Sequence, residues 1–375
     1  MANPLTGLEL RSTVSSDGKL TLSLEPVTLA APGPDEVIVR VEAAPINPSD
    51  LGLLLGPADP ATATAGGTAD SPVLTAAIPA ARMGAMKPRL DQSMAVGNEG
   101  AGTVVLAGEN VAGLLGKKVG MLGGAMYAQY RKLNARDCIV LPDGATAADG
   151  ASMFVNPLTA LSMVETLRME GHKALVHTAA ASNLGQMLNR VCIADGVPLV
   201  NIVRSEAQAA ILREIGAKYI VDSSAPDFRE KLTDAIAETG ATLAFDAIGG
   251  GKIVNAILHA MEAAINRTAT AYSRYGSSTW KQVYVYGMLD TAPMELDRGY
   301  GLAWGVSGFL VTPFLMKLGM EGTLRLRARV AAELTTTFAS SYTATISLAE
   351  ALDPKMVAAY ARRATGEKYL IDPSR

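Results

Sequence analysis

The sequence contains few of the residues from which metal and redox sites are built. Its 375 residues include two cysteines, Cys138 and Cys192, and three histidines, His172, His177 and His259. Neither a Cys-x-x-Cys nor a His-Glu-x-x-His spacing occurs, and the four cysteines of a structural zinc site are lacking. We therefore predict that both cysteines are buried thiols.

Long apolar runs and strong charge of one sign are also missing. The formal net charge is −3, and no basic stripe with interleaved aromatic residues is visible, so we expect no nucleic-acid partner. No apolar run approaches the roughly 18–20 residues of a membrane span. The first ten residues lack a basic region followed by an apolar core, so we expect no secretory signal and a cytoplasmic location.

The region 171–222 dominates what is present. An apolar run ends at His177, a loop of small residues follows, and a helical pattern extends from about Gln186 to Asp195. A second apolar run (197–203), another helical pattern and a third expected strand (216–222) come next. Strand–helix–strand–helix–strand is typical of the mononucleotide-binding half of a doubly wound parallel sheet.

The loop between the first strand and helix is a degenerate dinucleotide fingerprint. The glycine positions of G-x-G-x-x-G fall on Ala180, Ser182 and Gly185. Small residues there allow close approach of a pyrophosphate to the helix N-terminus. The alternative is a tight turn that binds nothing.

The flanking regions differ from this α/β centre. Short strands and turns, without long helices, predict a compact β domain through about residue 142; the strands are expected at 20–24, 35–42, 96–105, 117–121 and 127–132. Between about 56 and 95 the chain is rich in Ala, Pro, Thr and Gly. We interpret most of this segment as a long, partly mobile insertion, either a functional lid or a surface excursion without a role.

The second half continues the alternation of helices and strands. Helices are expected at 156–170, 227–239, 253–266 and 321–335, and strands at 241–246, 282–287, 307–312 and 367–371. The arginines Arg325, Arg327 and Arg329 are expected to form a solvated helix face.

Several motifs, in this order and spacing, resemble a known family. They are Ile46–Asp50, Gly97–Gly100, Asn156–Ala160, Ala179–Gly185, Asn201–Arg204, Phe245–Gly250 and Val285–Gly287. The chain resembles the zinc-independent medium-chain dehydrogenase/reductases, and within them the quinone oxidoreductases and mitochondrial-type enoyl reductases. The resemblance implies a Rossmann doubly wound parallel sheet (156–313) inserted in a β-rich, partly open, barrel-like (GroES-like) catalytic domain, built from residues 1–155 and 314–375.

The resemblance also implies NADPH as the cofactor and assigns residues to it. The cofactor-binding candidates are Asn47, Thr159, Ser182, Asn183, Leu184, Gly185, Arg204, Ser205, Ile248, Gly249, Gly287, Met288, Phe309 and Lys368. Structural alternatives remain: Thr159 could be a first-turn hydroxyl of a helix, and Gly249 and Gly287 could serve turn geometry alone.

Arg204 is the residue that we expect to set a preference for NADPH over NADH. It ends the second strand, where NAD-preferring sites place Asp or Glu for the ribose 2′-hydroxyl. A guanidinium there favours a 2′-phosphate. Glu206 argues against this, because it could pair with Arg204 or bind the ribose itself.

The chain departs from its relatives at the catalytic positions. Zinc alcohol dehydrogenases carry Cys and His where this chain has Asn47 and Asn98, so we predict that no zinc is bound. Enoyl reductases of the family carry a Tyr near the position of Gly56-Pro57, where no Tyr stands here. Asn47 and Tyr127 are the candidates for stabilising or protonating the reduced acceptor, although Tyr127 could be a core aromatic.

Three functions are compatible with these residues. The first is an NADPH-dependent quinone oxidoreductase, the second a reductase of activated C=C bonds in enones or enoyl thioesters, and the third a non-catalytic NADPH-binding protein. A homodimer is expected, paired along the apolar segment 305–311 at the edge of the Rossmann sheet.

Overall fold

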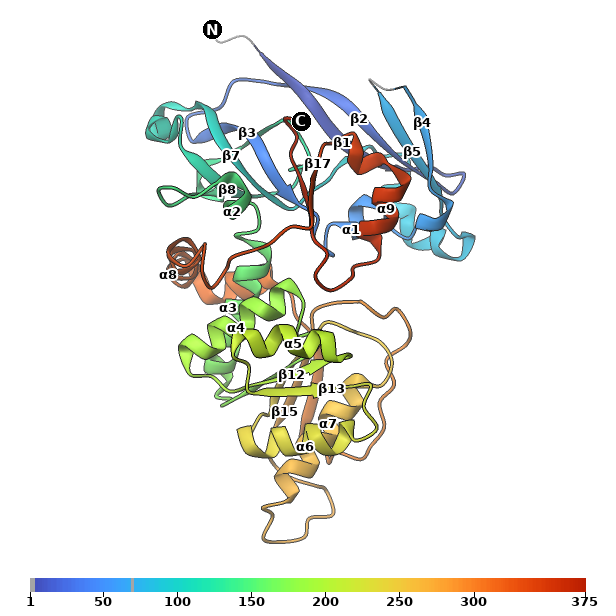
Figure 1. Cartoon of the computed structure of the whole chain (residues 1–375), viewed down its shortest axis with the longest axis vertical. Helices are drawn as coiled ribbons and strands as arrows, with labels where there is room; N and C mark the ends of the chain where they lie inside the picture. Colours follow the sequence, from blue (N-terminus) through green and yellow to red (C-terminus); the bar gives the residue numbers. More distant parts are fainter. Residues whose placement is uncertain (1–3, 69–70) are drawn as a thin grey trace. The chain divides into compact units, whose positions relative to one another are not determined.

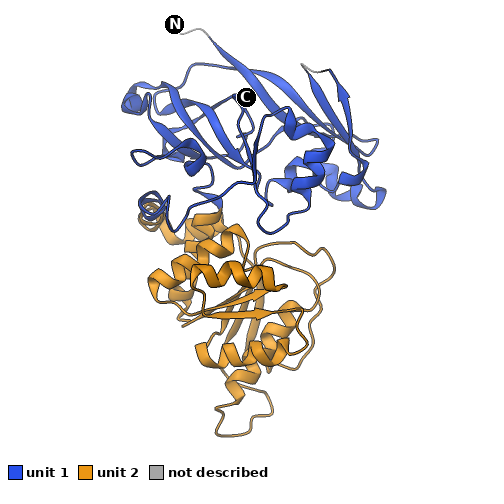
Figure 2. Ribbon diagram, in the orientation of Figure 1, with its two compact units in different colours: residues 1–155, 327–375 blue, residues 156–326 orange. Residues whose placement is uncertain are grey.

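The computed structural model describes residues 4–68 and 71–375, which form two compact units (Figure 2). Unit 1 comprises residues 1–155 and 327–375, and unit 2 comprises residues 156–326. The chain thus enters unit 2 at the position expected for the nucleotide-binding domain. It leaves at 326/327, whereas the expected boundary at 313/314 falls in the first turn of α8 (Val311–Ala332).

Unit 1 contains two antiparallel-rich sheets (Figure 1). The first has the strand order β4-β5-β2-β1-β6, with β1 Leu5–Val14, β2 Lys19–Leu29, β4 Thr64–Gly67, β5 Pro72–Ala77 and β6 Met94–Ala95. The second has the order β10-β8-β7-β3-β18-β17, with β9 also on β3; its strands are β3 Glu36–Pro45, β7 Glu99–Ala107, β8 Lys118–Leu122, β9 Tyr130–Asn134, β10 Cys138–Val140, β17 Ala344–Ile346 and β18 Tyr369–Ile371. The expected β-rich domain is confirmed, and the long strand β1 was missed.

In its described parts, 56–68 and 71–95, the segment is not the irregular insertion that its composition predicted. Strand β5 pairs with β2 in antiparallel register, and β4 pairs with β5. A 3-10 helix, Ala80–Arg89, leads back to β6, which pairs with β1. Leu74 is fully buried in the core of unit 1, so this segment completes a sheet.

Leu74→Ala should therefore destabilise the protein by about 2–5 kcal/mol, because it leaves a cavity in a packed core. Thr64→Ala, at an exposed position of β4, is the matched control and should change stability little. Urea denaturation of both variants measures the difference. Equal, small effects would show that the segment does not support the core.

Unit 2 is built on a six-stranded sheet in which every pairing is parallel. Its order is β13-β12-β11-β14-β15-β16, with β11 Leu175–His177, β12 Leu199–Val203, β13 Tyr219–Asp222, β14 Leu243–Asp246, β15 Lys281–Val285 and β16 Trp304–Gly308. The helices are α3 Val155–Glu170, α4 Asn183–Asp195, α5 Glu206–Ile215, α6 Phe228–Thr239 and α7 Ile253–Asn266. This order is that of a doubly wound dinucleotide-binding sheet, as predicted, with its switch point between β11 and β14.

Most expected elements of the second half are present, with shifts near residue 310. The last strand of the sheet is β16, which ends at Gly308 rather than beginning at Ser307. Helix α8 begins ten residues before the expected helix and is interrupted at Gly319, whose φ is 82°. The remaining helices belong to unit 1: α1 Leu51–Leu54, α2 Ala147–Gly150 and α9 Pro354–Ala361.

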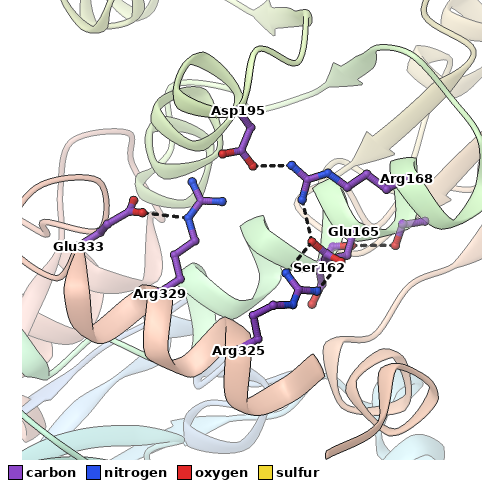
Figure 3. Close-up of polar contacts among 8 residues, drawn as sticks. Ser162, Glu165, Arg168, Asp195, Arg325, Arg329 and Glu333 are labelled. Atoms are coloured by element: carbon purple, nitrogen blue, oxygen red, sulfur yellow. Dashed lines mark hydrogen bonds and ion pairs between the residues drawn. The ribbon is translucent and has the colours of Figure 1, made fainter. Parts of the chain in front are cut away.

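Of the α8 arginines expected to form a solvated face, Arg325 is exposed and Arg327 and Arg329 are half-buried, and all three have bonding partners. Arg325 binds the carboxylate of Glu165, at 2.8 Å, and Arg168 binds the same carboxylate at 2.7 Å (Figure 3). Arg329 pairs with Glu333 at 2.9 Å, and Arg327 donates to the carbonyl oxygen of Arg136. These side chains fix the helix locally.

Candidate functional site

The fingerprint loop joins β11 to α4 within unit 2. At Gly185 an added Cβ would lie 2.1 Å from the carbonyl oxygen of Ala180, so no side chain fits without a backbone shift. Ser182 is the N-cap of α4, and its hydroxyl accepts from the N–H of Gly185 at 3.2 Å. Ala179 adopts a positive φ of 48°. The small residues therefore shape a tight loop at a helix N-terminus, the geometry that phosphate groups use.

The end of β12 carries the residues expected at the adenosine ribose. Arg204 follows Val203 directly and its side chain is exposed, while Ser205 caps α5 by accepting from the N–H of Gln208. Glu206 is held by Arg213 through two hydrogen bonds, of 2.6 and 2.9 Å. The carboxylate that could have paired with Arg204 is thus bound to another arginine.

A buried carboxylate organises the carboxyl ends of β11 and β14. Asp246 is fully buried and accepts from the hydroxyl of Thr178 at 2.7 Å and from the N–H of Gly249 at 2.8 Å. The N–H of Ile248 also bonds to it. Sequence reasoning missed Asp246 and Thr178, which form this contact across 68 residues of chain.

The two glycines at this edge pack backbone against backbone. A Cβ on Gly249 would lie 2.6 Å from the oxygen of Gly287, and one on Gly287 would lie 2.5 Å from the oxygen of Ala247. Close approach of two turns accounts for both glycines. Their contact with a cofactor remains a prediction.

The other residues expected around the cofactor in unit 2 have varied settings. Thr159 is buried one turn into α3, and Asn183 and Leu184 begin α4. Met288 is exposed, whereas the Phe309 ring packs edge-on against Phe245 at 5.1 Å between ring centroids. His177 is a buried core residue, as predicted; its Nε2 bonds to the Tyr286 hydroxyl at 2.7 Å, and burial lowers its pKa to about 3.

Unit 1 brings Asn47 and Glu99 together in its interior. Asn47 is 1% exposed, and its Nδ2 donates to Oε1 of Glu99 at 2.7 Å. The other carboxylate oxygen accepts from the backbone N–H groups of Phe154 and Val155, at 2.8 and 2.9 Å. Burial raises the pKa of Glu99. One N–H of Asn47 is therefore committed to a carboxylate.

Lys368, the lysine implied by the resemblance, is also in the interior of unit 1. Its Nζ donates to the Ser152 hydroxyl at 2.7 Å, and that oxygen lies 2.8 Å from the hydroxyl of Tyr342. Burial lowers the pKa of Lys368 to about 8, opposed by the carboxylates of Glu99 and Asp50. Nothing in the sequence pointed to Ser152 and Tyr342, since the contacts of Ser152 with Lys368 and Tyr342 join distant segments.

Tyr127 lies in the protein core and is fully buried. Its hydroxyl donates to the carbonyl oxygen of Pro45 at 3.0 Å. An added Cβ on Gly97 would lie 2.6 Å from its ring, which shows how tightly the ring is enclosed. This position fits the core-aromatic interpretation and does not support a role as proton donor.

Asp50 braces the same turn, as the sequence suggested. Its two carboxylate oxygens accept from the N–H groups of Asn47 and Asn98, at 2.7 and 2.8 Å. Burial raises its pKa from 3.8 to about 7, more than these hydrogen bonds lower it.

The free energy of unfolding should consequently depend on pH through Asp50. The folded protein binds this proton more tightly than the unfolded chain, so its contribution is full below about pH 4 and is lost as pH rises through about 7. Relative to Asp50→Asn, the wild type should lose about 2–4 kcal/mol across this range, since one pKa unit corresponds to about 1.4 kcal/mol. Urea denaturation at several pH values measures this difference. A difference that stays constant, or rises with pH, would contradict it.

Within residues 4–68 and 71–375, no group of three His, Cys, Asp or Glu side chains is placed to hold a metal ion. The absence of zinc stays a prediction, which metal analysis of the purified protein can test. No helix among the described residues is long and apolar enough to span a membrane.

No family model matches the chain. The chain is 26% identical over 214 residues to a mitochondrial enoyl-[acyl-carrier-protein] reductase of Bos taurus, which covers 55% of this chain and 50% of that protein. It is 26% identical over 254 residues to a synaptic vesicle membrane protein VAT-1 homolog of Rattus norvegicus, covering 66% and 55% of the two chains. The chain thus matches about half the length of these curated relatives.

Solved structures share the whole fold. One, described as a proposed NADPH:quinone reductase from Mesorhizobium loti, superposes with a TM-score of 0.72 at 24% identity and covers both chains completely. A mutant enoyl thioester reductase from Candida tropicalis gives a TM-score of 0.69 at 20% identity, over 98% of this chain and 100% of the other. The curated relatives bear out the resemblance to the mitochondrial enoyl reductases, and the solved structures show that the chain shares its fold with proteins of both groups, which confirms the fold class.

Proposed function

We propose that the protein is an NADPH-dependent reductase that transfers hydride to a quinone. The main support for NADPH as the cofactor is the geometry of unit 2. Its parallel sheet has the strand order of a dinucleotide-binding fold. At Gly185 no side chain covers the backbone of the loop, and at the end of β12 Arg204 is exposed. The relatives' names, which include enoyl reductases and a proposed NADPH:quinone reductase, support the same reaction class.

The residues present fit NADPH. The cradle at Gly185 and the α4 N-terminus would hold the pyrophosphate, and Arg204 with Ser205 would hold the 2′-phosphate. When bound, the cofactor supplies the hydride. Within unit 1, Asn47 and Lys368 are each held by a buried hydrogen-bond partner, as positioning residues require.

A quinone is the favoured acceptor because no tyrosine stands near Gly56-Pro57, just after the Asn47–Asp50 turn. At Gly56, where related enoyl reductases carry that tyrosine nearby, an added Cβ would lie 3.5 Å from Arg89 and 3.8 Å from the Met86 sulfur. Arg89 itself donates to the carbonyl oxygen of Leu53. A reduced quinone carries its charge on oxygen and exchanges protons readily with water, so it needs no dedicated general acid to protonate a carbon atom.

NADPH oxidation with a matched panel of quinones, enones and enoyl thioesters tests this proposal. We expect turnover with quinones and much slower turnover with enoyl thioesters. Faster thioester reduction would favour the second candidate, an enoyl reductase, which the enoyl reductase relatives support. Tight NADPH binding without turnover would favour a non-catalytic binding protein. The cytoplasmic location remains a prediction that this panel does not address.

We also propose a homodimer paired along β16, which is an edge strand of the unit 2 sheet. Leu302 and Leu310 flank this strand and are 73% and 65% exposed. In an antiparallel pairing about a two-fold axis these two leucines would meet. The double variant Leu302→Lys with Leu310→Lys should therefore weaken self-association about tenfold or more, since it places like charges together.

Sedimentation across a concentration series measures this association. The control is Leu115→Lys, which alters an exposed leucine of unit 1 and should leave the dimer intact. A wild-type protein that stays monomeric at micromolar concentration would refute the proposal.

A further inference from the structure

Glu99 is a fully buried carboxylate with three neutral hydrogen-bond donors. Burying a carboxylate is costly unless its oxygens are satisfied. Here one oxygen binds the side chain of Asn47, and the other binds two consecutive backbone N–H groups. The same carboxylate thus connects a candidate site residue to a distant piece of backbone.

That backbone is the crossover from unit 1 to unit 2. Val155 is the last residue of unit 1 before the chain enters unit 2, and it also begins α3. The Glu99 oxygen therefore accepts at the N-terminal end of a 16-residue helix, where a negative charge is favoured.

Other side chains of unit 1 hold this crossover as well. Ser152 receives the Lys368 ammonium, and the Arg327 guanidinium lies over the Phe154 ring, 5.5 Å from its centroid. Arg327 is the first residue after the chain returns to unit 1. The crossover segment 152–155 is therefore held by several side chains of unit 1. Because Glu99 binds both this segment and Asn47, the position of the segment fixes the orientation of the Asn47 side chain.

The contact with Glu99 also determines which atom of the Asn47 amide remains free to bind another group, the nitrogen or the oxygen. A carboxylate only accepts, so Asn47 must turn its Nδ2 toward Glu99. Its Oδ1 then points elsewhere; it is buried and has no hydrogen-bond partner among the described residues. A buried amide oxygen without a partner is costly in a folded protein, which suggests that a ligand supplies the donor.

We propose that Glu99 is a positioning residue: it holds the Asn47 amide so that Oδ1 is left as the acceptor for an O–H or N–H donor of a ligand, and it ties that orientation to the crossover segment 152–155. This inference rests on the proposed function. It revises the expectation that Asn47 acts mainly as a donor to the reduced acceptor, since its free end is an acceptor.

A double-mutant cycle tests the proposal. Glu99→Gln keeps the shape of the side chain, but its new NH2 group can bond to Oδ1 of Asn47 and turn the amide around. We expect kcat to fall about tenfold, because a misplaced positioning group raises the barrier more than it weakens binding. In an Asn47→Ala background the same Glu99→Gln change should alter kcat less than about twofold, because the group through which Glu99 acts is gone.

Equal losses in the two backgrounds would overturn the proposal and leave Glu99 a purely structural residue. Glu36→Gln is the matched control, since Glu36 also accepts a backbone N–H, from Gly33 at 2.8 Å, but lies away from the crossover. If Glu99→Gln fails to fold, Glu99→Asp replaces it. That variant keeps the charge but is one methylene too short to hold Asn47 and the crossover together.

Hydrogen exchange gives a readout that does not depend on turnover. The amides of Phe154 and Val155 should exchange slowly in the wild type and in Glu36→Gln, and faster in Glu99→Ala, which removes their acceptor. Unchanged exchange in Glu99→Ala would refute the link between Glu99 and the crossover. If the wild type reduces no acceptor, the proposed function fails on that result. The exchange experiment and the same cycle read by NADPH affinity then decide the role of Glu99.

Discussion

Replacing Arg204 with alanine should weaken NADPH binding roughly ten- to a hundredfold and hardly change NADH binding, because a hydrogen bond to a charged group contributes about 1.5–3 kcal/mol. The two cofactors differ only in the 2′-phosphate. A side chain that recognises this phosphate therefore changes one affinity and leaves the other nearly intact.

The structure removes the main objection to this prediction. Glu206 begins α5 and is bound by Arg213 on the same helix, which lowers the pKa of Glu206. A carboxylate engaged in this way does not need Arg204 as its partner. Arg204 follows the last residue of β12 and is exposed, so its guanidinium can reach a phosphate at the strand end.

Fluorescence titration of both cofactors against wild type and Arg204→Ala measures the effect. Arg229→Ala is the control, because Arg229 is an exposed arginine of unit 2 on the neighbouring helix α6. It should leave both affinities unchanged. Equal losses for NADPH and NADH in Arg204→Ala, or a wild type that prefers NADH, would refute the assignment.

The nucleotide-binding half was predictable because its signals are local. Strand β12 is apolar except for Asn201, and all five of its residues are buried, which is how a strand covered on both faces appears in a sequence. Small residues mark the loop before α4, and Gly196 and Gly216 end the helices α4 and α5 in the left-handed conformation. Each of these features depends on neighbours within a few residues.

Strand β5 could not be recognised in the same way. Its inward residues include Leu74 and Ala76, and its outward residues are Val73 and Thr75. An alanine facing the core and a valine facing outward blur the alternation on which strand prediction depends. The strand forms because β2 offers an edge for pairing, which is information from a distant part of the chain.

The site in unit 1 was only partly predictable for a related reason. The Asn47–Glu99 contact joins residues 52 apart, and the Lys368–Ser152 contact joins residues 216 apart. Sequence motifs identified Asn47 and, through the resemblance, Lys368. No local pattern reveals which residues orient them, because these partners come from distant segments that only the folding of unit 1 brings together.

Gly185→Ala should reduce NADPH affinity about a hundredfold or more, the larger of the two cofactor effects, because the loop and the helix that form the phosphate cradle can no longer pack together. The new Cβ would lie 2.1 Å from the Ala180 oxygen and 2.6 Å from its carbonyl carbon. Both are backbone atoms, so a rotamer change cannot relieve the clash. The loop must move away from the first turn of α4, and the N–H groups there move with it.

The substitution should also cost about 1–3 kcal/mol of stability, the usual effect of forcing extra atoms into a packed region. NADH affinity should fall as far as NADPH affinity, since both cofactors share the pyrophosphate; this separates the effect from that of Arg204→Ala. Gly113→Ala is the control, because a Cβ there meets nothing within 4 Å. Titration of both cofactors, with urea denaturation of each variant, provides the measurements. Unchanged affinity in a folded Gly185→Ala protein would show that the pyrophosphate does not bind at this loop.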